Sequence, residues 1–135
     1  MSETVYNARA VDVADIDGDL DLDVVAVGYY YLKWFENDAS QSFAAHGLAT
    51  PVGDAHQNVV AADVNGDADQ DIVVASYGSN SVEWHENDGS NSFTERVITT
   101  AADYAMSVFP ADVDGDADLD APSSAGNDPS TRVEE

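Results

Sequence analysis

The sequence predicts an all-β fold made of repeated four-stranded antiparallel units, of the kind that form the blades of a β-propeller. Two observations carry this prediction. An acidic loop recurs three times at a nearly constant spacing, and short β-branched segments separated by turn residues follow it. No segment shows a sustained helical period. A repeat of roughly 40 to 50 residues is typical of stacked or radial repeat folds, so the period organises the whole chain.

The repeat is most visible at the acidic loops. The three copies are DIDGDLDLD at 15–23, DVNGDADQD at 63–71 and DVDGDADLD at 112–120. Their first aspartates are 48 and 49 residues apart. The match extends well beyond the loops, because WFENDASQSF at 34–43 aligns with WHENDGSNSF at 84–93. The chain therefore holds two whole units and the start of a third.

The second unit, residues 55–102, shows how four strands arise. A small apolar run, NVVAAD, leads into the loop, and the β-branched run DIVVASY follows it. The next segment, SVEWHE, alternates, which predicts Val82 and Trp84 on one face and Glu83 and His85 on the other. The turn NDGSNS then separates it from a fourth strand, SFTERVIT.

The repeat divides the chain into four parts. Blade 1 is expected at residues 1–54, blade 2 at 55–102 and a partial blade 3 at 103–121. Residues 122–135 are interpreted as a polar tail, because Pro122 stands where a second strand should run and cannot donate a backbone hydrogen bond. Two and a half blades leave open edges, so we expect the fold to be completed by homo-oligomerisation, as a ring or a filament.

The acidic loops predict metal sites. Oxygen atoms at positions 1, 3, 5 and 9 of a tight loop, with the backbone carbonyl at position 7, can converge on one ion. A ligand set made only of oxygen favours calcium, and zinc is not expected, since the chain has no cysteine and the loops have no histidine. The alternative is a solvated acidic turn, but three copies at a fixed period favour up to three structural Ca²⁺ ions. The predicted ligands are Asp15, Asp17, Asp19, Asp21 and Asp23; Asp63, Asn65, Asp67, Asp69 and Asp71; and Asp112, Asp114, Asp116, Asp118 and Asp120.

The composition excludes several classes of partner. Among 135 residues, 27 are acidic and four are basic, and the formal net charge is −23. A surface this negative repels nucleic acid and anionic membranes but suits multivalent cations. No run of about 18 apolar residues exists, so we expect no membrane insertion. The N-terminus has no apolar signal core, so an export signal would lie outside this sequence or have been removed.

Taken together, the acidic loop, the apolar strand after it and the W-x-E-N-D-x-S-x-x-F segment resemble the FG-GAP/VCBS-type repeat. The resemblance covers roughly residues 7 to 120. It implies calcium-binding blades like those of the integrin α-subunit head, a propeller of about seven blades, an extracellular setting, and a role in adhesion or ligand binding. One departure concerns position 6 of the loop, where the family often has glycine. Leu20, Ala68 and Ala117 stand there, and glycine occupies position 4.

Repeated residues outside the loops are expected to be structural. Trp34 and Trp84 share a repeat position, which favours packing between blades over a ligand pocket. Glu36 and Glu86 precede the turns, which favours a capping role over general acid catalysis.

Residues that do not repeat are harder to interpret. The three histidines, His46, His56 and His85, share no repeat position, and we expect no catalytic or metal role for them. Residues 28–31, GYYY, form either a sugar- or protein-binding patch or part of a blade or subunit interface.

The predicted function is a non-enzymatic calcium-binding module for extracellular binding, adhesion or self-assembly, located outside the cell or at its surface. Possible ligands are a protein or a carbohydrate. One alternative is a fragment of a propeller enzyme, a polysaccharide lyase or hydrolase, although no acid–base pair can be picked out from the sequence. The other alternative is an architectural fibre or shell subunit.

Overall fold

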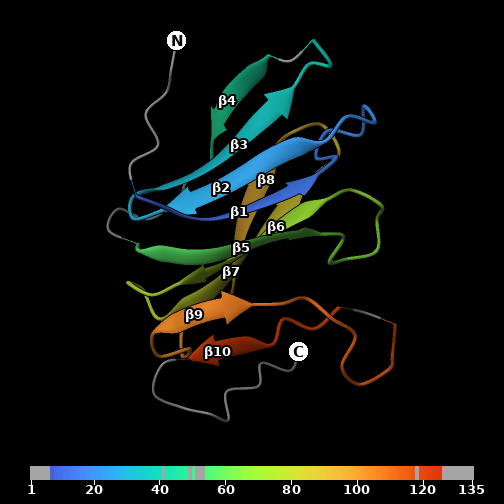
Figure 1. Cartoon of the computed structure of the whole chain (residues 1–135). Coiled ribbons are helices and arrows are strands. Elements are labelled where there is room, and N and C mark those ends of the chain that lie inside the picture. The colour runs from blue at the N-terminus through green and yellow to red at the C-terminus, as the bar shows by residue number, and fades with distance from the viewer. Residues whose placement is uncertain (1–6, 41, 49, 51–53, 118, 126–135) are drawn as a thin grey trace.

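The computed structural model describes residues 7–40, 42–48, 50, 54–117 and 119–125, and the regular structure in this part of the chain is entirely β-strand. Two four-stranded antiparallel sheets and one two-stranded sheet follow one another (Figure 1). The strands are β1 (Ala8–Ala14), β2 (Asp23–Gly28), β3 (Tyr31–Asn37), β4 (Phe43–Gly47), β5 (His56–Ala62), β6 (Asp71–Ser76), β7 (Ser81–Asn87), β8 (Phe93–Thr99), β9 (Ala105–Val108) and β10 (Ser123–Ala125). The predicted all-β fold of four-stranded antiparallel units is confirmed.

Each four-stranded sheet is a simple meander, with strand orders β1-β2-β3-β4 and β5-β6-β7-β8. The sequence N-D-x-S closes the third hairpin connection in both sheets. Asp38 Oδ1 accepts hydrogen bonds from the backbone N–H and the hydroxyl of Ser40, at 2.9 and 2.6 Å. Asp88 and Ser90 repeat this arrangement at 2.9 and 2.8 Å. Aspartate stabilises such turns because its short side chain can bond the backbone two residues later.

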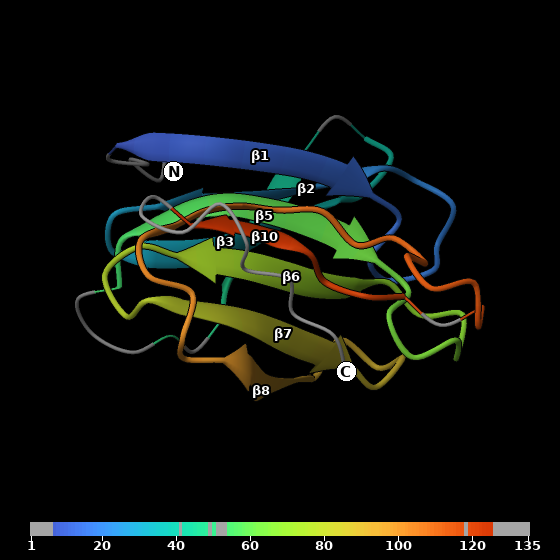
Figure 2. The same cartoon turned by 90° about the horizontal axis from the view of Figure 1, so that it is seen from below.

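The blades stack through their first strands, since β1 contacts β5 and β5 contacts β9 (Figure 1). Side chains tie these strands together. Asp12 Oδ2 accepts a hydrogen bond from the Ala61 N–H at 2.9 Å, and Asn58 Oδ1 accepts one from the Val108 N–H at 3.1 Å. Seen from below, the connections that follow β1, β5 and β9 all project at the same end of the stack (Figure 2). This side-by-side placement of first strands is the arrangement that a propeller uses at its centre.

The apolar core consists of two layers between blades. The layer between blades 1 and 2 contains Val25, Val27, Leu32, Val59, Ile72 and Val74. The layer between blades 2 and 3 contains Val73, Ala75, Val82, Ala102, Ala105, Val108 and Ala121. Trp34 lies at the first layer, where its ring centroid is 6.2 Å from that of Phe93, and Trp84 packs against the second. The expected packing of both tryptophans between blades is confirmed.

Both faces of the middle strands of blade 2 are buried, which the alternating sequence of β7 did not reveal. Every residue of β6 is buried, with alternate side chains entering the two core layers. Glu83 and His85 pair with Val74 and Ile72, so they share the face that packs on blade 1. The predicted alternation is correct, but the second face is covered by protein, because a blade has a neighbour on each side.

Blade 3 extends beyond the boundary predicted at residue 122. Ser123–Ala125 form β10, which pairs antiparallel with β9. Pro122 lies just before this strand, and its carbonyl accepts a hydrogen bond from the Phe109 N–H at 3.1 Å. The chain therefore pairs again directly after Pro122, although this strand has three residues where β2 and β6 have six. Proline lacks a backbone N–H but keeps its carbonyl, and the carbonyl of Pro122 is the group that takes part in the pairing.

Glu36 and Glu86 do not cap turns but pair across the sheet. Glu36 Oε2 lies 2.7 Å from His46 Nε2 on the neighbouring strand. Glu86 forms an ion pair with Arg96, which also lies on the adjacent strand. Cross-strand partners replace the expected caps, because a basic residue stands diagonally across, two positions from the residue directly opposite each glutamate.

Candidate metal centres

The three acidic loops lie at one end of the blades, each joining the first strand of its unit to the second (Figures 1 and 2). The strand pair that closes each loop is also repeated. Ala14 pairs with Asp23, and Ala62 pairs with Asp71, at the start of β2 and β6. In blade 3 an isolated bridge joins Ala111 to Asp120. The loop is therefore held at its two ends by the same backbone pairing in all three copies.

The three loops repeat the same left-handed backbone at positions 4 and 6. The glycines at position 4 have φ of 76°, 76° and 84°, and the residues at position 6 have φ of 78°, 77° and 79°. The position 6 residues are Leu20, Ala68 and Ala117. They adopt the left-handed conformation that costs an L-residue about 1–2 kcal/mol. Each loop therefore holds a strained non-glycine residue at position 6.

The carboxylate at position 1 organises each loop. It accepts a hydrogen bond from the N–H of position 6, at 3.0 Å for Asp15, 2.9 Å for Asp63 and 3.1 Å for Asp112. In loops 2 and 3 it also accepts one from the glycine N–H at position 4, at 2.7 and 2.6 Å. In loop 1, Asp15 Oδ1 is buried and has no hydrogen-bond partner among the described residues.

Side chains within the loops converge. One ligand oxygen each from Asp15, Asp17 and Asp19 lies within 4.8 Å of the others. Loop 2 differs because its position 3 is Asn65, whose amide donates a hydrogen bond to Asp67 Oδ2 at 2.9 Å. Because asparagine is neutral, loop 2 avoids the repulsion that an aspartate at position 3 would add.

In loop 3 the converging set is Asp112, Asp114 and Asp120, again within 4.8 Å. The N–H of Asp116 bonds Asp114 Oδ1 at 3.2 Å, which repeats the contact between Asp19 and Asp17 in loop 1. The last predicted ligand of this loop, Asp118, lies outside the described residues.

The aspartate at position 9 has a second role that the sequence did not indicate. Asp23 is buried and accepts backbone N–H bonds from Ile16 at 3.1 Å and Asn37 at 2.8 Å. Asp71 repeats both contacts, with Val64 at 3.1 Å and Asn87 at 2.8 Å. These carboxylates join the loop to the end of the third strand. Burial raises the pKa of Asp71, against the opposing effect of its backbone hydrogen bonds.

Position 7 is Asp21 in loop 1 and Asp69 in loop 2. The N–H of each donates to the carboxylate at position 5, at 2.9 Å in both loops. The Asp69 carboxylate also packs against Gly89, where an added Cβ would lie 2.6 Å from Asp69 Oδ2. The loop thereby contacts the β7–β8 turn of its own blade.

The electrostatics of the loops match their composition. Burial raises the pKa of Asp17 and is opposed by the hydrogen bond from the Asp19 N–H, while repulsion from Asp23, Asp19 and Glu36 raises it further. A buried oxygen without a donor, left-handed backbone at fixed positions and clustered carboxylates fit a hard cation such as Ca²⁺, which takes six to eight oxygens at about 2.3–2.6 Å.

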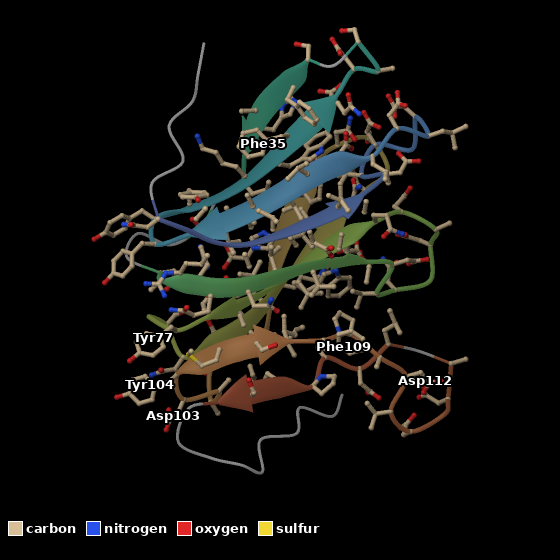
Figure 3. The ribbon with its side chains drawn as sticks, viewed as in Figure 1. Phe35, Tyr77, Asp103, Tyr104, Phe109 and Asp112 are labelled. Carbon is tan, nitrogen blue, oxygen red and sulfur yellow. The ribbon has the colours of Figure 1, made fainter. Side chains whose placement is uncertain are left out.

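The tyrosines lie at the other end of the blades. Figure 3 places Tyr77 and Tyr104 side by side and far from Asp112, and their ring centroids are 5.0 Å apart. Tyr29 and Tyr30 form an edge-to-face pair at 4.5 Å, with the Arg9 guanidinium 5.6 Å from the Tyr29 ring. Tyr30 is exposed and Tyr31 half-buried, so the GYYY segment contributes both to the surface and to packing.

The acidic loops and the strands around them are also the part of the chain that matches a known protein family. Residues 15–74 and 63–121 each match the family model of the FG-GAP-like repeat. The chain belongs to this family. The two overlapping matches span all three acidic loops, and the FG-GAP-like repeat accounts for the observed blades. No curated protein matches the chain. Among the residues that the structure describes, no helix has the length and apolar character needed to span a bilayer.

Sequence reasoning missed one group of side chains. Asp54, His56 and Glu83 lie close together inside blade 2, away from the acidic loops. His56 was not expected to have a functional role, because it does not recur at the same position in the other repeats. Departure from the repeat at a buried position is the signal that would have found it.

Proposed function

We propose that this chain is a non-enzymatic, calcium-stabilised β-propeller module that acts outside the cell in binding or self-assembly. Membership of the FG-GAP-like repeat family supports a β-propeller-like module, and such repeats are typically non-catalytic and commonly extracellular. The observation that carries the calcium proposal is the geometry common to all three loops. In each, the position 1 carboxylate accepts a hydrogen bond from the position 6 N–H, and in loops 1 and 3 two further carboxylate oxygens converge beside it.

Up to three calcium ions would be held by the side chains at positions 1, 3, 5 and 9 and by the backbone carbonyl at position 7. When bound, calcium supplies positive charge that offsets repulsion among the carboxylates. The ligands come from one loop between two strands, so the ion joins the first strand of a blade to the second. Because the unfolded chain has no such site, binding stabilises the fold, by about 2.7 kcal/mol for one site at a calcium concentration 100 times the Kd.

Removing one predicted ligand tests this proposal, because the change in melting temperature should have opposite signs in calcium and in EDTA. We expect Asp17→Ala to lower the melting temperature relative to the wild type in excess calcium, since one ligand is lost. In EDTA the same variant should melt at or above the wild-type temperature, because a carboxylate with an elevated pKa is removed. The matched control is Asp103→Ala, an exposed aspartate outside the loops with the same change in charge.

Two results would contradict calcium binding. One is a melting temperature of the wild type that does not change between EDTA and millimolar calcium. The other is an equal response of Asp17→Ala and Asp103→Ala to calcium, because a general charge effect would then account for the data. Isothermal titration of the same three proteins gives the number of sites and their affinities.

The same blade geometry supports self-association. Val11 in blade 1 and Val59 in blade 2 stand at one repeat position, but Val11 is 62% exposed and Val59 is 2% exposed. At the other end, Val113 is exposed, whereas its equivalent Ile16 is buried. Each open face therefore carries apolar residues that are covered wherever the chain itself provides a neighbouring blade.

We propose that a second copy of the chain covers these faces, with blade 3 of one copy against blade 1 of the next. The argument is continuity, since this contact would repeat the blade packing already present twice within one chain. Such a contact is heterologous, so it closes into a ring or continues as a filament. A ligand, protein or carbohydrate, would then meet a larger surface than one chain offers. One candidate surface is the groove lined in part by Trp34, His46, Leu48 and Phe93.

A mixing experiment tests head-to-tail assembly. Val11→Asp and Val113→Asp should each be monomeric in sedimentation velocity, since each loses one face. An equimolar mixture should form a dimer that grows no further, because the two intact faces are complementary. Wild-type protein that stays monomeric at all concentrations, or single variants that assemble like the wild type, would overturn the proposal.

A further inference from the structure

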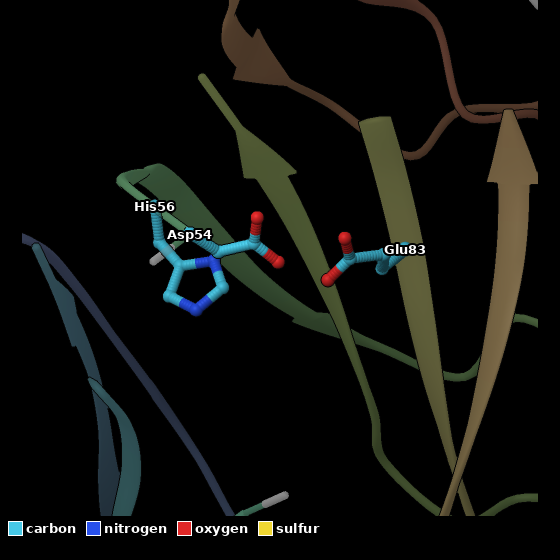
Figure 4. A group of neighbouring side chains, drawn as sticks. All are labelled: Asp54, His56 and Glu83. Atoms are coloured by element: carbon cyan, nitrogen blue, oxygen red, sulfur yellow. The ribbon is translucent and has the colours of Figure 1, made fainter. Parts of the chain in front are cut away.

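A compact group of titratable side chains lies inside blade 2. Asp54 precedes β5, His56 is the first residue of β5, and Glu83 lies in β7. Their exposed fractions are 5%, 0% and 2%, and one ligand atom from each lies within 4.8 Å of the other two. Figure 4 shows the Asp54 and Glu83 carboxylates facing each other, with the His56 imidazole beside Asp54. The group is at the opposite end of β5 from the acidic loop.

The hydrogen bonds around this group are incomplete. His56 Nδ1 lies 2.8 Å from Ser76 Oγ, and Ser81 Oγ donates to Glu83 Oε1 at 2.6 Å. The remaining atoms, His56 Nε2, Asp54 Oδ2 and Glu83 Oε2, are buried with no hydrogen-bond partner among the described residues. A buried polar atom without a partner costs about 1–3 kcal/mol, and more if it is charged. Figure 4 shows His56 Nδ1, and not Nε2, on the side of the two carboxylates, so the two facing carboxylate oxygens without a donor are what indicates a cation between Asp54 and Glu83.

The group is not a requirement of the blade. The positions of His56 and Glu83 are occupied in blade 1 by Ala8 and Lys33, and blade 1 forms the same four strands. The two serines also do not recur, because Gly28 and Tyr31 take the places of Ser76 and Ser81. An arrangement needed only for folding would be expected in both blades.

We propose that Asp54, His56 and Glu83 bind one divalent transition metal ion of the zinc class. One imidazole nitrogen and two carboxylate oxygens are a ligand set that zinc accepts, with a further position open to a fourth donor. Two carboxylates and a neutral imidazole carry a charge of −2, which such an ion neutralises. Calcium takes oxygen ligands, so the imidazole sets this site apart from the acidic loops.

The two serines support the ligands from outside. The hydroxyl of Ser81 occupies Glu83 Oε1 and leaves Oε2 free, while Ser76 holds the His56 ring in place. Contacts of this kind orient ligands in metal sites. The bound ion joins the segment before β5 to β7, which are not neighbouring strands, and so stabilises blade 2 by a route independent of calcium.

Zinc uptake by the full chain, measured by titration calorimetry with calcium at saturation, tests the proposal. Saturating calcium occupies the acidic loops, so zinc is directed to sites that contain imidazole. We expect one tight site. His56→Asn and Glu83→Gln should weaken zinc by more than the roughly 10–100-fold that outer contacts contribute. The matched controls are His46→Asn and Asp103→Asn, which change an exposed histidine and an exposed carboxylate and should leave the tight site intact.

X-ray absorption of the zinc-loaded wild type gives a test that needs no variant. Imidazole produces a characteristic scattering pattern, and we expect one imidazole together with oxygen ligands. Wild-type protein that takes up no zinc, equal binding by all four variants, or a zinc spectrum without imidazole would overturn the proposal. Glu83→Gln should fold without metal, because it replaces a buried carboxylate by a neutral group of the same shape.

Discussion

Val59 and Val11 differ in one respect, the presence of a covering blade. They stand at the same repeat position in first strands of the same kind, but Val59 packs in the core layer between blades 1 and 2, and Val11 lies on the open face of blade 1. Replacing each by alanine makes the same covalent change. The difference between the two losses in the free energy of unfolding therefore measures what a covering blade contributes.

The magnitude follows from the exposed fractions. Valine to alanine removes two carbons, and burial of each is worth about 0.8 kcal/mol, or about 1.6 kcal/mol together. At Val59, 2% exposed, the cavity adds to this loss, so we expect about 2–3 kcal/mol. At Val11, 62% exposed, only about two-fifths of the transfer energy is lost, or about 0.6 kcal/mol, and no closed cavity forms.

Urea denaturation followed by tryptophan fluorescence checks these values. The measurement needs saturating calcium and a protein concentration at which sedimentation shows monomers. Midpoints are compared at a shared m-value. Equal losses for the two variants in the monomer would refute the reasoning, since the covering blade would then make no difference. If copies associate as proposed, the loss at Val11 should increase with protein concentration.

Three further predictions test the loops and the blade contacts. Ala68→Gly should raise the free energy of unfolding by about 0.5–1 kcal/mol, because glycine relieves the left-handed strain at this position. The control Ala45→Gly lies in β4, where glycine weakens a strand, and should lower the free energy of unfolding. The opposite order of the two variants would contradict the loop geometry. In EDTA, acidification from pH 7 to about 4.5 should lower the free energy of unfolding, because burial lowers the pKa of the His85 imidazole from 6.5 to about 4, so its stabilisation is present above pH 6.5 and lost as pH falls towards 4. Burial raises the pKa of Asp17 and of Asp71, which opposes this loss. In saturating calcium the loss on acidification should be larger, since protons also compete with the ion, and urea midpoints at both pH values would expose a failure of either expectation. Asn87→Ala should cost about 1–3 kcal/mol in chemical denaturation, because its amide donates to the buried carbonyl of Ile16 in blade 1. Asn37→Ala, at the half-buried equivalent position, should cost less, and an equal cost would argue against this contact.

The sequence by itself determined the features that depend on neighbours along the chain. The period located the three acidic loops and the strands around them, because β-branched runs, turn residues and alternating aspartates act through local backbone preferences. The converging carboxylates at positions 1 and 3 of loops 1 and 3 could be named for the same reason, since a tight loop brings alternate side chains together whatever surrounds it. The family could be named from those segments as well.

Only the tertiary structure decided which faces are covered. Glu83 and His85 alternate with apolar residues as a solvent-facing set would, yet blade 1 buries them. The buried role of Asp23 and Asp71, the strand after Pro122 and the group around His56 are of the same kind. Each of these features depends on contacts with residues of another strand or blade, and those contacts exist only in the folded stack. A repeated pattern describes one blade, whereas burial, charge neutralisation and pairing depend on the blade beside it.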